Sequence, residues 1–167
     1  MLTWSLGQDR RTAPWLAGIA PMIGVPHYDY TQGKASPYEL PVIGFYGYSD
    51  PIVPPGTFWD DWTKDSSGYY WVPAHRMHTT WAQDHGCNVH QFNGEPPNVY
   101  FENSNLQGFE ISCKTHCPLP QHESDLTNPP PYSVDCRVEM GHETPAFMMQ
   151  MALRFFEQHD RYTNPSL

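Results

Sequence analysis

Two uninterrupted apolar runs constrain the fold of this chain more than any other feature of its sequence. They are WLAGIAPMIG, at residues 15–24 between Pro14 and Pro26, and PVIGFYG, at residues 41–47. A strand with one solvated face alternates apolar and polar residues, whereas a strand of a parallel sheet is covered on both faces and stays apolar throughout. The two runs therefore predict two buried strands.

Helical patterns surround these strands in the sequence. Residues 1–12 place apolar side chains on part of one helical face, and a proline opens and a glycine closes the helical pattern of residues 73–86. The segment 145–159 has large apolar side chains at helical spacing, among them Phe147 and Phe155. This spacing indicates core packing rather than a cofactor site.

The segment 87–131 is rich in turns and contains two short strand candidates, NVYF and FEISC. After three consecutive prolines, SVDCRVEM at 133–140 alternates as a strand does. Buried strands separated by helices predict an α/β fold with a short, mostly parallel sheet, helices on both faces and ligands bound beyond the carboxyl ends of the strands. The length of 167 residues predicts one domain, 1–167.

The chain is acidic, with 9 Lys and Arg against 18 Asp and Glu and a formal net charge of −9. Nucleic acids and anionic membranes attract clustered basic side chains, so we expect neither as a partner. No apolar run approaches the roughly 18 residues that cross a membrane, and the first residues lack the basic-then-apolar order of a signal peptide.

Four cysteines in the second half of the chain predict disulfides. An even cysteine count in a segment crowded with turns is typical of oxidised proteins, so we expect a secreted or extracellular location. Three pairings are open for Cys87, Cys113, Cys117 and Cys136. The alternative is a metal site, because CKTHCPLPQH brings the middle two cysteines together with His116 and His122, although this spacing matches no standard zinc pattern.

Two ionisable residues follow predicted strands at the edge where such folds bind ligands. Asp50 lies three residues beyond the run 41–47, and His142 lies in the turn after the strand 133–140. Because the carboxyl ends of parallel strands share one edge, the carboxylate can accept the Nδ1 proton of the imidazole and hold the ring in one tautomer. An imidazole held in this way is suited to act as a general base near neutral pH.

The sequences around these two residues, GFYGYSDPIVP and RVEMGHETP, resemble the acid and histidine motifs of the α/β-hydrolase fold, and WAQDHGC lies between them. Together they are similar to the esterase group that holds feruloyl esterases and polyhydroxybutyrate depolymerases. LAGIAPMIG also resembles the strand that follows the nucleophile helix in this group. The resemblance thus covers nearly the whole chain but only the C-terminal part of the family's fold. The matching residues are Gly47, Asp50, Val53 and Pro54, then Trp81, Gly86 and Cys87, and finally Gly141, His142 and Pro145.

The resemblance implies a carboxylic ester hydrolase with a Ser-His-Asp triad, in which Asp50 is the acid and His142 the base, without a metal or other cofactor. Its substrate would be a small-molecule or polymer ester, and feruloylated polysaccharide, hydroxyalkanoate polyester and simple esters all stay open. Six aromatic residues could line a pocket for an acyl group or stack on sugars, although we expect them to cover one side of the sheet. They are Phe58, Trp59, Trp62, Tyr69, Tyr70 and Trp71.

The serine of such a triad lies before the acid, on a strand-to-helix elbow written G-x-S-x-G, and this pentapeptide does not occur here. TWSLG at 3–7 is a variant, but only four residues precede Ser5, which leaves no room for the strand that an elbow needs. We expect Ser5 to be an ordinary helix serine and the nucleophile to precede Met1. These 167 residues alone should then have negligible esterase activity.

The expected loss of the nucleophile strand has a structural consequence. Segment 17–24 would present an unpaired edge of the sheet, so we expect self-association through it. The missing serine also allows a second interpretation, a pseudo-hydrolase that binds a partner without catalysis. The third is a small metal-binding domain built on the cysteines and histidines.

Overall fold

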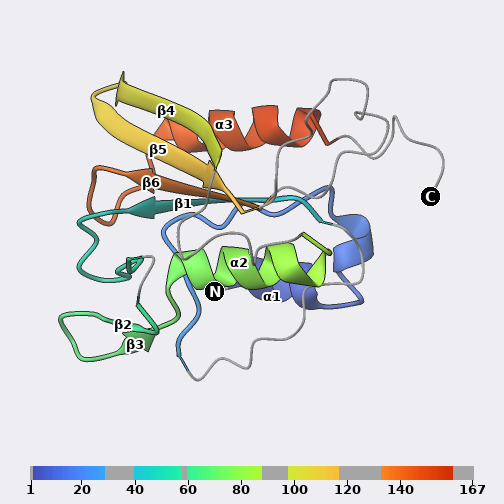
Figure 1. The fold of residues 1–167 in the computed structure, drawn as a ribbon, viewed down its shortest axis with the longest axis horizontal. Helices are drawn as coiled ribbons and strands as arrows, with labels where there is room; N and C mark the ends of the chain where they lie inside the picture. The colour runs from blue at the N-terminus through green and yellow to red at the C-terminus, as the bar shows by residue number, and fades with distance from the viewer. Residues whose placement is uncertain (1, 29–39, 58–59, 88–97, 117–132, 160–167) are drawn as a thin grey trace.

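A computed structural model of the chain describes residues 2–28, 40–57, 60–87, 98–116 and 133–159. Its centre is a four-stranded sheet in the order β1-β6-β5-β4, with helices on both faces, and a separate two-stranded ribbon pairs β2 with β3 (Figure 1). The elements in chain order are α1 (Leu2–Gln8), the short 3-10 helix η1 (Ala13–Trp15), β1 (Val42–Gly47), β2 (Thr63–Lys64), β3 (Tyr70–Trp71), α2 (Ala74–Asp84), β4 (Asn98–Leu106), β5 (Phe109–Thr115), β6 (Ser133–Val138) and α3 (Ala146–Glu157).

The sheet is mixed, so the prediction of a mostly parallel sheet is wrong. β1 and β6 are parallel, but β6 pairs with β5 and β5 with β4 in antiparallel fashion. The β4–β5 pairing follows from a tight hairpin whose two central residues, Gln107 and Gly108, both have positive φ, at 54° and 92°. A two-residue turn with both φ values positive matches the twist of antiparallel strands and reverses the chain at once.

The first apolar run, 15–24, lies beside β1 but forms no continuous strand. It makes two isolated parallel bridges to β1, at Ile19 and Met22. Pro21 has no amide hydrogen to give to a ladder, and Ile23 has a φ of 52°, outside the extended region. The predicted buried strand is therefore an irregular edge segment. The self-association expected there stays a prediction.

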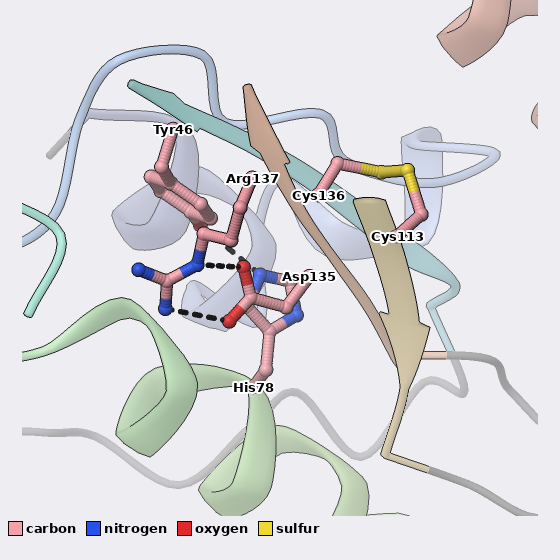
Figure 2. Close-up of a disulfide and its surroundings, with 6 residues drawn as sticks. All are labelled: Tyr46, His78, Cys113, Asp135, Cys136 and Arg137. Carbon is pink, nitrogen blue, oxygen red and sulfur yellow. Dashed lines mark hydrogen bonds and ion pairs between the residues drawn. A yellow bond between two sulfur atoms is a disulfide. The ribbon is translucent and has the colours of Figure 1, made fainter. Parts of the chain in front are cut away.

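Successive side chains of β6 point to opposite faces of the sheet. Asp135 and Arg137 point toward α2, whereas Cys136 points the other way (Figure 2). α3 covers one face of the sheet, and α1 and α2 lie on the other (Figure 1). The prediction that Phe147 and Phe155 pack in the core is confirmed, because both are buried beneath α3 with Met151 partly buried beside them. That core is built largely from Ile43, Phe45, Val134, Val138, Phe147, Met148, Ala152 and Phe155.

The structure resolves one of the pairings that the cysteine spacing left open. Cys113 and Cys136 stand opposite each other on β5 and β6 and form a disulfide. Cys87 is also disulfide-bonded, and Cys117 lies outside the described residues. The prediction of disulfides is confirmed for this part of the chain. Cys113 is oxidised and so cannot serve as the thiolate ligand that the metal-site alternative required.

Candidate active site

The loops that follow β1 and β6 lie against each other at the carboxyl ends of these strands. The amide of Tyr48 donates to the Val138 carbonyl over 2.8 Å, and the amide of Ser49 donates to the Met140 carbonyl over 3.0 Å. Gly47 makes this approach feasible, because a Cβ there would lie 2.6 Å from the Met140 carbonyl oxygen and still closer to that of Gly141. The two loops are thus joined by backbone contacts before any side chain is considered.

Asp50 is held on both of its carboxylate oxygens. Oδ1 accepts from the amides of Ile52 at 2.8 Å and Val53 at 3.0 Å, while Oδ2 lies 2.8 Å from Nδ1 of His142. All three partners can act as donors, which suits an ionised carboxylate because it only accepts. The side chain of Asp50 is 1% exposed, so its orientation is set by these contacts rather than by water.

His142 has one nitrogen engaged and one open. Because Nδ1 faces a carboxylate, it carries the proton of the neutral ring, and Nε2 is then the acceptor. The side chain is 39% exposed, and no hydrogen bond to Nε2 occurs within the described residues. A ring fixed on one side by a buried acid and open on the other can take a proton from an incoming group.

The position of His142 follows from the short connection between β6 and α3. Glu143 donates its amide to the Gly141 carbonyl over 3.1 Å, which closes a tight turn around the histidine. Pro145 occupies the N-cap position of α3, and the helix begins at Ala146. The structure thus brings together the two side chains that the sequence paired, Asp50 and His142, and their catalytic roles stay predictions.

Ser5 lies inside α1, as an ordinary helix serine does. Its carbonyl accepts the amide of Asp9 over 3.0 Å, and the neighbouring Trp4 packs edge-on against Trp81 of α2. Trp4 also donates its indole hydrogen to the Gly24 carbonyl over 3.3 Å. No hydrogen bond in the described part of the chain joins a serine to His142.

A second polar cluster, which no motif marked in the sequence, lies sealed between β6 and α2 (Figure 2). Asp135 and Arg137 form a bidentate ion pair, with Nε to Oδ1 at 2.6 Å and Nη2 to Oδ2 at 2.8 Å. Burial opposes ionisation of Asp135, but the charge and hydrogen bonds of Arg137 outweigh it and hold the pKa of the carboxyl at about 2. The one signal in the sequence was an acid and an arginine two apart on a strand, which places them on one face.

His78 of α2 completes this cluster as a neutral ring. The Ser133 hydroxyl donates to the His78 carbonyl at 2.9 Å, so it must accept from Nδ1 of His78, also at 2.9 Å. Nε2 is then the acceptor for the Tyr46 hydroxyl at 3.1 Å. Burial lowers the pKa of His78 to about 3, because a charged ring would be cut off from water here.

His116 stacks on His78 with ring centroids 5.7 Å apart, and its Nδ1 lies 3.0 Å from the Thr79 hydroxyl. Burial lowers the pKa of His116 to about 4. Within the described residues no group of three His, Cys, Asp or Glu side chains could hold a metal ion. His122, the remaining histidine of the metal-site alternative, lies outside them.

The described residues of the aromatic loop match their expected role only in part. Trp62, Tyr69 and Tyr70 are exposed around the β2–β3 ribbon, so they do not cover a face of the sheet. Trp71 is partly buried against a cluster that contains Tyr46 of β1, and it stacks on His27 with ring centroids 4.1 Å apart. The other two aromatic residues of the loop, Phe58 and Trp59, lie outside the described residues.

Comparison with known proteins adds no relative to these observations. No protein-family model and no curated protein matches the sequence. None of the helices in the described ranges is both long and apolar enough to cross a membrane.

Proposed function

We propose that this chain carries the acid and the base of a carboxylic ester hydrolase with a Ser-His-Asp triad. The observation that supports it is the hydrogen bond of 2.8 Å between the buried Asp50 and the half-exposed His142, which leaves Nε2 open. A carboxylate that fixes Nδ1–H and stabilises the imidazolium is the arrangement that lets histidine act first as base and then as acid.

The reaction would proceed by acyl transfer. His142 Nε2 takes the proton of a serine hydroxyl as its oxygen attacks the ester carbonyl, and it then gives that proton to the leaving alcohol. Water, deprotonated by the same nitrogen, releases the acid and frees the serine. Asp50 stays ionised throughout and holds the ring.

The serine in this proposal comes from outside these 167 residues, on a strand-to-helix elbow that precedes α1. The fold would be the C-terminal part of an α/β-hydrolase of the feruloyl esterase and polyhydroxybutyrate depolymerase group. Its substrate would be a small-molecule or a polymer ester. The Cys113–Cys136 disulfide supports an oxidising, extracellular location.

The decisive experiment reads the transcript upstream of Met1 and expresses the chain that it encodes. We expect an in-frame G-x-S-x-G and turnover of p-nitrophenyl acetate that falls on the order of 10⁴-fold in His142→Ala. His85→Ala, at the C-terminal end of α2, is the control and should keep the wild-type rate. An upstream sequence without that pentapeptide, or a His142→Ala variant with wild-type turnover, would refute the proposal.

A non-catalytic pseudo-hydrolase is the second candidate, since the elbow pentapeptide is absent from these 167 residues. It differs from the first in one measurable respect. A longer chain with an intact Asp50–His142 pair but no elbow serine would bind an ester or a protein partner without turning it over.

A further inference from the structure

The loop that begins with Asp50 is anchored at its far end through three consecutive carbonyls. Those of residues 54–56 accept, in order, from the Thr63 hydroxyl at 2.9 Å, the Ala74 amide at 2.9 Å and Nη1 of Arg137 at 2.8 Å. The first two donors belong to the β2–β3 ribbon and to α2. The third belongs to β6, the strand that leads directly to His142.

Arg137 is suited to this role because its own position is determined on several sides. Asp135 holds Nε and Nη2, and the guanidinium carbon lies 5.5 Å from the centroid of the Tyr46 ring. Both charged side chains are buried, at 4% and 0% exposure, so water does not compete for them. Nη1 therefore points in one fixed direction, toward the Gly56 carbonyl.

The receiving end of this contact is equally constrained. Gly56 has a φ of +72°, which a residue with a side chain rarely adopts. A Cβ at this position would also lie 3.0 Å from the Pro73 Cβ, so the loop packs closely where it meets α2. Arg137 thus links the loop after the acid to the strand before the base.

We propose that Arg137, oriented by Asp135, is a positioning residue for the Asp50–His142 pair. It acts by fixing the loop from which Asp50 projects. Its importance for catalysis rests on the proposed function, whereas its effect on the pair does not. A displacement of about 1 Å in a catalytic group is enough to reduce a rate on the order of 10²-fold.

The test is the tautomer of neutral His142, read from long-range proton–nitrogen spectra of histidine-labelled protein. The variant is Asp135→Leu with Arg137→Met, because replacing both members of a buried ion pair by apolar side chains leaves no unpaired charge. Val134→Ala is the matched control, since it removes buried contacts from the other face of β6 without touching the Gly56 carbonyl.

We expect wild type and Val134→Ala to show the Nδ1-protonated ring, and the double variant to show a mixture of both tautomers. A folded double variant that keeps the wild-type tautomer would overturn the proposal. If the double variant does not fold, Arg137→Lys decides, because lysine keeps the charge but cannot make all three contacts. A mixed tautomer in that variant supports the positioning role, and an unchanged one overturns it.

The rate provides a separate readout in the longer enzyme. There we expect kcat of Arg137→Lys to fall on the order of 10²-fold with KM unchanged. A changed tautomer without any esterase turnover in the wild type would contradict the proposed function but not the positioning role.

Discussion

Two clusters in this molecule are each built on a buried carboxylate, and they differ in the partner. The side chains of Asp50 and Asp135 are 1% and 0% exposed, so both acids are removed from water. Asp50 faces His142, whose side chain is 39% exposed, whereas Asp135 faces Arg137, whose side chain is 4% exposed. Burial of the acid therefore does not distinguish the proposed catalytic pair from a structural ion pair.

The separating property is whether a proton can enter and leave. Guanidinium does not lose its proton in proteins, so the Asp135–Arg137 pair keeps one charge state and only holds the chain in place. Imidazole can exchange its proton near neutral pH, and the His142 side chain is 39% exposed, with no hydrogen bond to Nε2 from any described residue. His78 shows the third case, an imidazole sealed in the structural cluster and kept neutral there by burial.

The sharpest contrast between the clusters should come from Asp50→Asn. An asparagine amide at Oδ2 would donate to His142 and favour the wrong tautomer, so turnover by the longer enzyme that we propose should fall on the order of 10⁴-fold. The amides of Ile52 and Val53 keep their acceptor, so thermal stability should change little. Asp61→Asn, at an exposed carboxylate, is the control and should leave both quantities unchanged. Retained turnover in Asp50→Asn would place this pair among the structural contacts.

Arg137→Met should cause the largest loss of stability, about 3–5 kcal/mol in urea unfolding, because it leaves Asp135 buried and unpaired. Arg76→Met is the matched comparison, since Arg76 pairs with Asp61 at 3.5 Å and both side chains are well exposed. Exposed pairs contribute about 0–1 kcal/mol. Equal losses in the two variants would show that the second cluster is not sealed.

Acid should weaken the fold through the buried histidines. His78 and His116 have pKa values of about 3 and about 4 in the folded protein, against 6.5 when unfolded. Below pH 6.5 the unfolded chain therefore binds protons that the folded chain does not, and stability falls as the pH falls. Each ring should contribute a loss of about 2 kcal/mol between pH 7 and pH 5.

The other charged or titratable groups that face these two rings are Asp135, Arg137 and His75. The unfolding measurements between pH 7 and pH 5 stay above the pH range in which ordinary carboxylates titrate. Urea unfolding of His78→Asn at the same pH values isolates the share of one ring. Between pH 7 and pH 5 its stability should fall by about 2 kcal/mol less than that of the wild type, because His75 and His159, whose pKa values burial also lowers to about 4, are present in both proteins. A wild-type stability that is flat from pH 7 to pH 5 would contradict the assignment of neutral rings.

Gly47→Ala should have the smallest effect of the four and should act on the open cluster. Its methyl group would meet the carbonyls of Met140 and Gly141, so we expect a loss of about 1–3 kcal/mol from overpacking. Gly141→Ala is the control, because it adds a methyl group to the loop after β6 at a position with no neighbouring atom within 4 Å. Thermal unfolding of the two variants compares them directly, and equal midpoints would show that the loops do not touch in solution.

Strong local patterns were enough to predict several elements. The helical patterns at 73–86 and 145–159 appear as α2 and α3. Apolar side chains at this spacing lie on one face only if the segment is helical, and that face can then be buried. Asp50 and His142 could be paired from their places after β1 and β6, since neighbouring parallel strands end at one edge.

Other features depended on contacts that no local pattern encodes. The mostly parallel sheet was wrong because β5 pairs antiparallel with both β6 and β4, and the β4–β5 direction is decided by a two-residue turn whose φ values the sequence does not display. Segment 15–24 is apolar enough for a strand, but Pro21 and the backbone of Ile23 interrupt its ladder.

The sequence by itself determined which segments are apolar, which are helical, and that an acid and a histidine follow two strands of one sheet. Only the tertiary structure decided that Cys113 pairs with Cys136 and that Arg137 reaches the Gly56 carbonyl. Periodicity reports which face of an element is buried, but the identity of the partner depends on register and on loops that bring distant residues within a few ångströms. Whether a buried acid can take part in proton transfer depends on the residue it pairs with and on the exposure of that residue to water.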